Sequence, residues 1–278
     1  MRSAFLFFSL VIFIGGYAQL IYPVVGTYKG KGAQGMAIYG DSALLMSDGG
    51  GYRLLDLSSG RIVRDGVLAS AGKNTHVNCA CFSSEKVNGS FYPLLYITEF
   101  RDPSRCFVEQ IGEDGRNKLV QTISAMKNGT KELVRVWVVD NAKKKLYGII
   151  RDKKHLNNIG SVKNTILKFR LPDIREEQNV ILTEKDVESR FEVVFPNALQ
   201  GAKIRKGLMY IATGYSEYTR SSTEYPRALL VIDLRKQKIV KSIDLTYVTT
   251  NGPEDIDFHK GKCLMYCGQT GGIYRIKY

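Results

Sequence analysis

The 278-residue sequence has few of the residues and motifs that carry common enzyme chemistry. It contains three histidines and one tryptophan, and no Gly-x-Ser-x-Gly nucleophile motif, phosphate-binding loop, dinucleotide fingerprint or calcium loop. These absences argue against the enzyme classes that such motifs identify. The cysteines and histidines also lack the spacings of a zinc site, so we expect neither a metal nor another cofactor.

Long apolar runs are scarce as well. The sequence offers one, residues 4–14, which is too short to span a bilayer. Arg2 precedes this run and the small residues Gly16 and Ala18 follow it, which is typical of a secretory signal peptide cleaved after Ala18. We therefore expect the first 18 residues to be removed and residues 19–278 to form one domain, with a retained anchor helix as the alternative. This domain would be periplasmic, cell-surface or extracellular, without a transmembrane segment.

Cysteines are few, and their number does not predict a disulfide framework. An odd count of five leaves at least one thiol unpaired in a monomer. Cys79 and Cys81 lie two apart in one expected strand, and Cys263 and Cys267 lie four apart in another, so each pair shares a face of its strand. We expect these side chains and Cys106 to be buried as small apolar groups, with one disulfide as the alternative in an oxidising compartment.

Acidic residues are fewer than basic ones, 27 against 40, which gives a formal net charge of +13. The Lys and Arg residues are scattered and form neither a basic helix nor an aromatic-and-basic RNA motif, so a nucleic-acid partner is not expected. The basic runs 143–145, 151–154 and 235–236 fall at expected hairpin tips, where we interpret them as solvated turns. An exported basic surface favours anionic glycans or envelope phosphates as partners, and the sequence indicates no oligomeric state.

Glycine and aromatic residues, in contrast, are abundant, with 27 Gly, 16 Tyr and 12 Phe. This composition argues against a coiled coil, a helical bundle or a disordered chain, and 44% apolar residues are enough for a full core. One pattern recurs along the chain: a short apolar strand, a turn, a strand ending in small residues, and a strand closed by Asp before a polar turn. The repetition predicts blade-like units of antiparallel strands.

Aligning this pattern divides the mature chain into five units. The expected strands cover residues 35–38, 43–47, 52–56 and 61–67 in the first unit; 76–82, 94–100, 106–111 and 119–123 in the second; 134–139, 146–150, 165–169 and 180–182 in the third; 202–205, 208–214, 228–233 and 238–244 in the fourth; and 255–258, 262–267 and 272–276 in the last. The last unit lacks a fourth strand, and residues 21–27 are expected to supply it and close the ring. Helix is restricted to one turn capped by Thr183 and ending at Ser189. We therefore predict an all-β protein, a β-propeller of five blades, with six as the alternative.

In a β-propeller the innermost strand of each blade starts near one mouth of the central channel, so the residues just before these strands converge on the axis. The residues at these positions are Gln34 and Gly35, His76 with Asn78, Gln200 and Gly201, and Glu254 and Asp255, and the third unit offers Arg135, Trp137 and Asp140. The Gln-Gly pair thus occurs twice. Glycine allows neighbouring backbones to crowd the axis, and an amide both donates and accepts hydrogen bonds.

These positions predict a polar ligand site at the channel mouth, suited to a sugar or a short peptide. Its residues are Gln34, His76, Asn78, Gln200 and Glu254, with Trp137 or Tyr215 as an apolar floor. Two alternatives stay open: the polar side chains only solvate a narrow tunnel, and Trp137 only packs in the core. For catalysis, His76 with Glu254 or Asp255 is the one acid–base pair that the alignment brings together.

Several segments also resemble a known family. These are Ala-Gln-Gly-Met-Ala at 33–37, His-Val-Asn-Cys-Ala-Cys-Phe at 76–82, Tyr-Pro-Leu-Leu-Tyr at 92–96, Gln-Gly at 200–201 and Pro-Glu-Asp-Ile at 253–256. Together they resemble the secreted TolB-like and YncE-like propeller proteins of Bacteroidetes over nearly the whole mature chain. The resemblance implies a propeller fold and export, and it implies no activity.

A weaker similarity is to the five-bladed glutaminyl-peptide cyclotransferases. Their first blade also opens with a Gln-Gly phrase like that at 34–35 and continues into a strand-turn-strand like residues 55–62. The Glu-bearing motifs of that family's later blades are not found, so the similarity carries over no catalytic role.

We therefore expect a binding or interaction module rather than an enzyme, with a glycan, a peptide or an envelope component as ligand. One alternative is an enzyme of the cyclotransferase, glycan hydrolase or lyase type that uses His76 and Glu254. The other is a purely structural surface protein.

Overall fold

The computed structural model describes residues 18–23, 32–101, 105–151, 160–196, 198–216, 224–268 and 272–278. These residues form 22 β-strands and one short 3-10 turn, and they contain no α-helix. Among them, no helix has the length and apolar character needed to cross a membrane. The expected signal segment up to residue 17 lies outside the described residues, so export stays a prediction.

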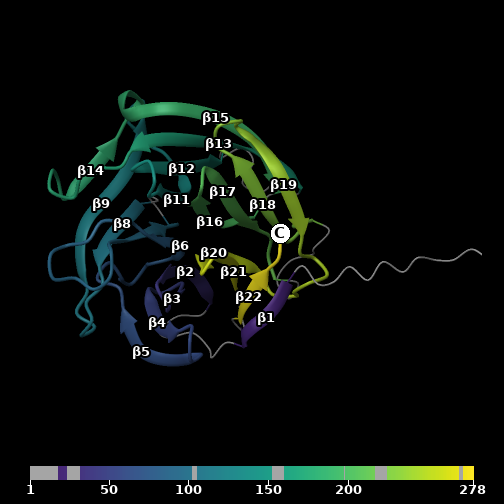
Figure 1. Cartoon of the computed structure of the whole chain (residues 1–278). Helices are drawn as coiled ribbons and strands as arrows, with labels where there is room; N and C mark the ends of the chain where they lie inside the picture. Colours follow the sequence, from purple (N-terminus) through teal and green to yellow (C-terminus); the bar gives the residue numbers. More distant parts are fainter. Residues whose placement is uncertain are drawn as a thin grey trace, which may run out of the picture.

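The strands form five small antiparallel sheets arranged as blades around a central axis, which confirms a five-bladed β-propeller (Figure 1). From the axis outward, the first blade contains β2 (Ala33–Tyr39), β3 (Ser42–Ser47), β4 (Gly51–Asp56) and β5 (Arg61–Val67); the second β6 (Val77–Phe82), β7 (Leu95–Glu99), β8 (Arg105–Gln110) and β9 (Lys118–Lys127); the third β11 (Val134–Asp140), β12 (Lys145–Arg151), β13 (Ser161–Arg170) and β15 (Val187–Pro196); the fourth β16 (Leu199–Arg205), β17 (Leu208–Thr213), β18 (Ala228–Asp233) and β19 (Lys238–Asp244); and the fifth β20 (Pro253–His259), β21 (Lys262–Cys267), β22 (Gly272–Ile276) and β1 (Ala18–Pro23).

The N-terminal strand closes the ring, as the sequence predicts. β1 pairs antiparallel with β22, with Gln19 opposite Arg275 and Pro23 opposite Gly272, so it covers the outer edge of the fifth blade (Figure 1). The strand runs over Ala18–Pro23 rather than the expected 21–27, and residues 24–27 lie outside the described part of the chain. The Tyr22 hydroxyl donates a hydrogen bond to the Leu57 carbonyl, which ties this last strand to the first blade.

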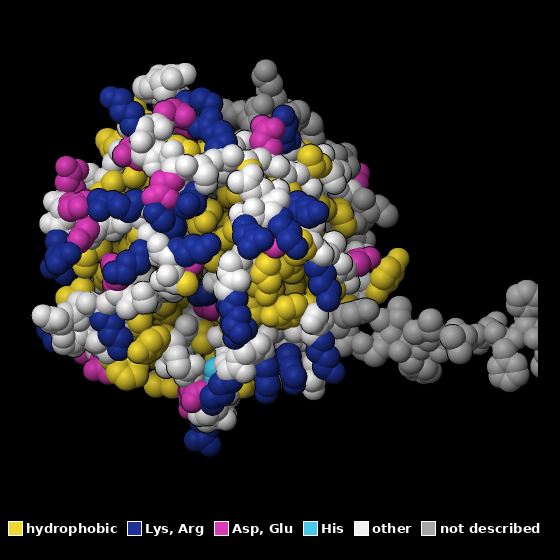
Figure 2. Space-filling view, turned by 45° about the horizontal axis from the view of Figure 1, so that its top comes forward, with side chains coloured by type: hydrophobic (Ala, Val, Ile, Leu, Met, Phe, Trp, Pro, Cys, Tyr) yellow, Lys and Arg dark blue, Asp and Glu magenta, His cyan; other side chains and the backbone are white. Residues whose placement is uncertain are grey.

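Basic side chains are spread over the visible face of the molecule, with acidic and apolar side chains between them (Figure 2). Lys143 lies in the turn between β11 and β12, where the Asp140 carboxylate accepts its backbone N–H at 3.3 Å. Arg235 and Lys236 lie in the matching turn between β18 and β19, on the carboxylate of Asp233. The expected hairpin-tip positions of these two basic runs are therefore confirmed.

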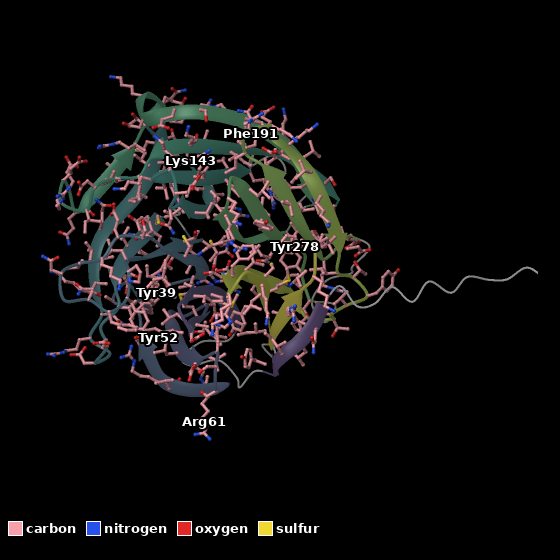
Figure 3. The ribbon with its side chains drawn as sticks, viewed as in Figure 1. Tyr39, Tyr52, Arg61, Lys143, Phe191 and Tyr278 are labelled. Atoms are coloured by element: carbon pink, nitrogen blue, oxygen red, sulfur yellow. The ribbon has the colours of Figure 1, made fainter. Side chains whose placement is uncertain are left out.

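The core lies between the faces of neighbouring blades. Phe191 of β15 and Tyr52 of β4, both labelled in Figure 3, are buried on inward faces, whereas Arg61 at the start of β5 points away from its blade into solvent. All five cysteines are free and at most 1% exposed, which confirms their interpretation as buried apolar groups and shows no disulfide.

The expected fourth strand of the third blade is wrong. Residues 180–182 belong to β14 (Asn179–Leu182), which pairs in parallel with β9 of the second blade. The fourth strand is β15 instead, whose ten residues match the ten of β13 and alternate between buried and exposed. Thr183 does cap a turn with the Asp186 side chain, but this turn covers only Glu184–Asp186, because the chain enters β15 at Val187.

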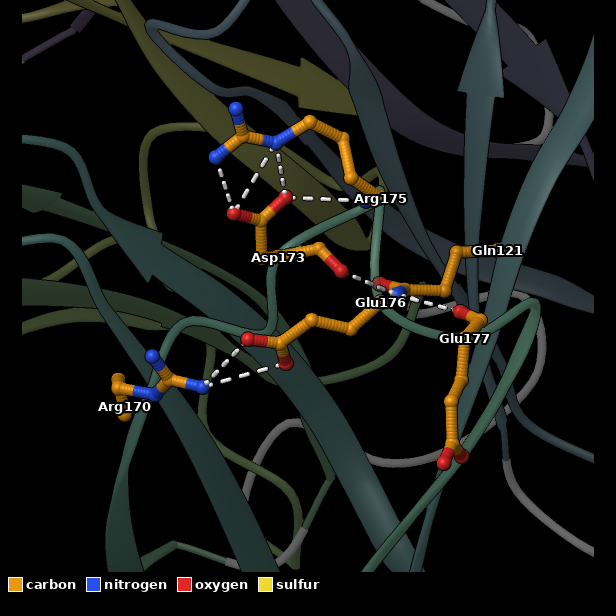
Figure 4. A network of polar contacts seen from close by, with 6 residues as sticks. All are labelled: Gln121, Arg170, Asp173, Arg175, Glu176 and Glu177. Atoms are coloured by element: carbon orange, nitrogen blue, oxygen red, sulfur yellow. Dashed lines mark hydrogen bonds and ion pairs between the residues drawn. The ribbon is translucent and has the colours of Figure 1, made fainter.

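A polar network explains why β14 joins the second blade (Figure 4). The buried amide of Gln121, on β9, donates hydrogen bonds to the carbonyls of Asp173 at 3.1 Å and Glu177 at 2.8 Å. These contacts hold the loop after β13 against β9, so that the following strand β14 pairs with the outer edge of β9. The Asp173 carboxylate forms an ion pair with Arg175 in the same loop, and the Glu176 carboxylate forms one with Arg170 at the end of β13.

Candidate functional site

Every innermost strand carries a β-bulge at its beginning. In β2, Ala33 lies opposite Ser47 and Met36 opposite Leu45, so β2 has one residue more than its partner between these pairs. The same single-residue excess occurs near the start of β6, β11, β16 and β20. Bulges re-aim side chains next to functional sites. The residues in the five bulges are Gln34 and Gly35, Asn78 and Cys79, Arg135, Gln200 and Gly201, and Glu254.

The positions of the five bulges correct the expected equivalence between the blades. The sequence offered both His76 and Asn78 in the second unit, and Arg135, Trp137 and Asp140 in the third. The bulges place Asn78 and Arg135 at the positions equivalent to Gln34. His76 instead precedes β6, where its backbone N–H donates to the Glu99 carboxylate at 3.0 Å.

A cavity of about 440 Å³ opens at this mouth of the propeller. Its lining comes from all five blades and consists of Gly32, Ala33, Gln34, Asp48, His76, Asn78, Phe100, Arg135, Arg151, Leu199, Gln200, Tyr215, Ser216 and Glu254. Of the seven residues that the sequence assigned to a ligand site, the structure brings six together here: Gln34, His76, Asn78, Gln200, Tyr215 and Glu254.

Trp137, the seventh, does not line the cavity. Its side chain is 1% exposed, and its ring lies 6.0 Å from that of Phe169 in the core between blades. A Cβ atom on Gly148 of the adjacent strand would come within 3.3 Å of the indole. Trp137 therefore packs in the core, the alternative that the sequence also allowed.

Side chains fill the axis beneath the cavity. The fully buried Asp255 carboxylate accepts backbone hydrogen bonds from Met36 at 2.8 Å, Ala80 at 2.9 Å and Ile256 at 2.8 Å, so it ties β2 and β6 to β20. Burial raises the pKa of the Asp255 carboxyl, and these three N–H donors oppose the rise. The amide of Asn78 donates to the carbonyls of Arg135 at 3.0 Å and Gln200 at 3.3 Å, across two further blades.

The glycine of the second Gln-Gly pair allows a close approach at the axis. A Cβ atom on Gly201 would lie 2.7 Å from the Asp255 Cα and 2.0 Å from its carboxylate oxygen. Gly35 is crowded as well, with the Ala80 nitrogen 3.3 Å from a built Cβ atom. The expected role of these glycines in crowding the axis is confirmed.

Two arginines give the cavity positive charge. The Arg135 guanidinium lies over the Phe100 ring, 4.0 Å from its centroid, and burial lowers the pKa of this group. Arg151 is 3% exposed, and its pKa is lowered to about 10 by burial and by the charge of Arg135. The interpretation of the run 151–154 as a solvated turn is therefore wrong for Arg151, which ends β12 and faces inward; residues 152–154 lie outside the described part of the chain.

Glu254 is one of the two acidic residues in the described lining of the cavity, the other being Asp48. Burial, together with the nearby charge of Asp255, raises the pKa of its carboxyl to about 8. The carboxyl packs against two glycines, since a Cβ atom on Gly268 would lie 2.3 Å from Oε1 and one on Gly252 would lie 3.1 Å away. At neutral pH this group is therefore mostly protonated and able to donate a hydrogen bond.

His76 is the titratable base of the cavity. Burial and the charge of Arg101 lower its pKa, and the carboxylates of Asp48 and Glu99 oppose that shift. Its ring lies 5.4 Å from the Phe100 ring. The imidazole is therefore neutral at pH 7, so the cavity holds a protonated carboxyl and an unprotonated imidazole.

Sequence reasoning missed Asp48, Phe100 and Arg151 as lining residues. They come at or just after the ends of the second strands of their blades, which run antiparallel to the innermost strands and finish at the same mouth. The strand repeat used to locate Gln34 could also have located these residues. In an antiparallel pair the second strand ends beside the start of the first, so the residues that follow the second strand lie at the same mouth.

The raised pKa of Glu254 predicts that stability falls as the pH rises. Between about pH 5 and pH 8 the unfolded chain releases this proton while the folded protein keeps it, so each pH unit lowers the free energy of unfolding by up to about 1.4 kcal/mol. Glu254→Gln removes this dependence. In urea denaturation its stability relative to the wild type is expected to increase from pH 5 to pH 8.

The control for this measurement is Glu113→Gln, because Glu113 is an exposed loop residue. Its stability relative to the wild type is expected to stay constant over the same range. Parallel pH curves for Glu254→Gln and the wild type would contradict the raised pKa.

Comparison with known proteins shows a likeness of fold. No family model and no curated protein matches the chain. Among solved structures it is similar to a glucose dehydrogenase, with a TM-score of 0.53, 8% identity, and coverage of 93% of this chain and 99% of that one. It is also similar to the glutaminyl cyclase of Myxococcus xanthus, with a TM-score of 0.53, 15% identity, and coverage of 93% and 94%.

These identities are low enough to show the fold alone. The similarity to five-bladed glutaminyl cyclases is thus seen in the architecture, whereas no family match supports the resemblance to secreted propellers of Bacteroidetes. Within the described residues, no three His, Cys, Asp or Glu side chains converge as metal ligands would.

Proposed function

We propose that the chain is an exported β-propeller binding module whose ligand occupies the cavity at the channel mouth. The observation that carries this proposal is the cavity itself, about 440 Å³, with polar side chains contributed by all five blades. Its volume lies within the range of small-molecule sites. A sugar, a short peptide or a component of the cell envelope is the class of ligand that fits this size and polarity.

Three polar side chains in the cavity support the proposal. The Gln34 amide, the His76 imidazole and the Glu254 carboxyl form no hydrogen bond with any described residue. They are therefore available to a ligand, and they combine donors with acceptors. The rings of Phe100 and Tyr215 add apolar surface beside them.

Export is part of the proposal, and the ring can keep its closing strand after cleavage. Removal of the residues up to Ala18 leaves Gln19, Leu20 and Tyr22 of β1 still paired with β22. N-terminal sequencing of the protein recovered from the periplasm or medium of an expressing bacterium should find Gln19 as the first residue. Recovery of the intact N-terminus in the cytoplasm would contradict export.

A glycan and peptide array probed with the mature protein tests the binding function. We expect selective binding, and His76→Ala and Glu254→Gln should each weaken it about tenfold, the effect of one lost hydrogen bond of about 1.4 kcal/mol. The matched controls are His259→Ala, at the opposite end of an innermost strand, and Glu113→Gln in an exposed loop; both should leave binding unchanged. A silent array, or equal losses in the controls, would count against the proposal.

A second candidate function is acid–base catalysis by His76 and Glu254. The observation that favours it is their protonation at neutral pH: the lining of one cavity contains an acid with a pKa of about 8 and a base with a lowered pKa. Such an enzyme would be of the glutaminyl-peptide cyclotransferase type or a glycan hydrolase or lyase. Incubation with peptides that begin with glutamine, followed by mass spectrometry for loss of ammonia, separates the two functions. Turnover that Glu254→Gln abolishes while binding persists would favour the enzyme.

A further inference from the structure

The Arg135 guanidinium has an unusual environment for a half-buried cation. Its contact within the described residues is with the Phe100 ring, at 4.0 Å from the centroid, and no described carboxylate pairs with it. Burial already lowers the pKa of this group, so its charge is held in the cavity at a cost in solvation. Buried charges in proteins are normally paired, so Arg135, which has no carboxylate partner among the described residues, is suited to pair with an anionic group that enters the cavity.

The other described residues of the lining do not form an ion pair with Arg135. Arg151 adds a second positive charge near Arg135. The pKa of about 8 leaves Glu254 mostly uncharged at neutral pH, and the lowered pKa of His76 leaves its ring neutral. Besides Glu254, the described lining contains two guanidinium groups and one acidic side chain, that of Asp48. Positive charge therefore predominates among the described lining residues.

We propose that the ligand of the channel-mouth cavity carries an oxyanion group, a carboxylate or a phosphate, and that Arg135 binds this group. The inference rests on the proposed binding function and names the chemistry that this site recognises. It adds a charge requirement to the size and polarity already described.

The geometry suits this role. A guanidinium is planar and donates two parallel hydrogen bonds to a carboxylate or phosphate, and contact with the Phe100 ring restrains the Arg135 side chain before the ligand arrives. The half-buried position also strengthens the interaction relative to an exposed site. The Gln34 amide and the protonated Glu254 carboxyl both line the same cavity and can donate further hydrogen bonds to the anion or to neighbouring hydroxyl groups.

Matched acids and amides test the inference. Isothermal titration of the mature protein at neutral pH would use D-glucuronate and D-glucuronamide, N-acetylglycine and its amide, and inorganic phosphate. For at least one pair we expect the acid to bind about tenfold or more tightly than the amide. Comparison of the affinities for glucuronate, N-acetylglycine and phosphate shows whether the anionic group belongs to a sugar acid, an amino acid or a phosphate.

Variants of Arg135 assign the preference to this residue. Arg135→Gln is expected to abolish the preference for the acid, and Arg135→Lys to keep only part of it, because charge remains but the planar fork is lost. The lysine variant also keeps the test decisive if the glutamine variant does not fold. The matched control is Arg205→Gln, since Arg205 stacks on Phe258 in the same way, at 4.7 Å, at the far end of β16. This control should bind like the wild type.

The outcomes separate the inference from the proposed function. Equal binding of acid and amide, or an acid preference that survives in Arg135→Gln, overturns the inference. If array ligands then depend on His76 and Glu254 but not on Arg135, the binding function stands without it. If neither the array nor any titrated probe shows binding at millimolar concentration, both fall.

Discussion

Replacement of Lys203 by methionine is expected to lower the free energy of unfolding by about 3–5 kcal/mol. The Lys203 ammonium forms an ion pair with the Asp257 carboxylate at 2.9 Å, and these side chains are only 11% and 3% exposed. Burial lowers the pKa of Lys203, but the neighbouring carboxylates of Asp257 and Asp255 outweigh it and hold the pKa above its ordinary value. Methionine fills a similar volume and leaves the buried Asp257 charge without its cation.

The matched control is Lys163→Met. Lys163 pairs with Glu192 at 3.1 Å on the outer part of the third blade, where both side chains are more than half exposed. Exposed pairs contribute about 1 kcal/mol or less, so urea denaturation should separate the two variants clearly. Similar small losses in both would contradict a structural role for the pair at the axis.

Along the channel axis, residues below the cavity hold the blades together, whereas residues at the mouth line the candidate ligand site. The Asp257 carboxylate also accepts the Ile38 N–H at 2.8 Å, so it joins the first, fourth and fifth blades. One step toward the mouth, Asp255 joins the first and second blades to the fifth. Glu254, its neighbour in sequence, lies in the bulge and faces the cavity. The hydrogen bonds of Asp255 and Asp257 between blades thus hold in place the backbone that positions Glu254 in the cavity.

The blades could be predicted from the sequence because their turns are encoded locally. Asp56, Asp140 and Asp233 each end a strand and accept hydrogen bonds from backbone N–H groups two or three residues later. These short-range contacts need no knowledge of the rest of the chain. The strand boundaries around them therefore match the expected ones within a few residues.

The position of β14 depends on distant contacts and was not predictable in the same way. Its short apolar run suits either the third or the second blade, and the Gln121 amide, more than fifty residues away, decides between them. β15 has a readable alternation, with Phe191, Val193 and Phe195 facing inward, but the capping signal at Thr183 suggested a helical turn over its first residues.

The candidate site was predicted in part for a related reason. Gln34 and Gln200 stand out because glycine follows each, whereas Asn78 and Arg135 occupy equivalent bulges without that mark. A bulge is a property of two paired strands, so one strand's sequence does not reveal it. Arg151 was hidden because a basic run at a strand end usually marks a solvated turn.

Replacement of Gly201 by alanine is expected to be strongly destabilising although it adds a single methyl group. The new Cβ atom would lie 2.7 Å from the Asp255 Cα, which is backbone, and 2.0 Å from a carboxylate oxygen held by the Ile256 N–H. Neither atom can move without loosening the hydrogen bonds from Met36 and Ala80. The expected loss is about 3 kcal/mol or more, the upper range for overpacking.

Alanine replacements of two less crowded glycines provide the comparison for this prediction. Gly35→Ala meets its neighbours at 3.2–3.3 Å and is expected to cost about 1–2 kcal/mol. Gly72→Ala, in a loop where the nearest atom is 3.8 Å away, should change stability by about 0.5 kcal/mol or less. Urea denaturation of the three variants should therefore rank them Gly72, Gly35 and Gly201 in order of increasing loss. If Gly201→Ala does not fold while Gly35→Ala folds with reduced stability, the ranking still holds. A Gly201→Ala protein as stable as Gly72→Ala would show that the axis is not closely packed at Asp255.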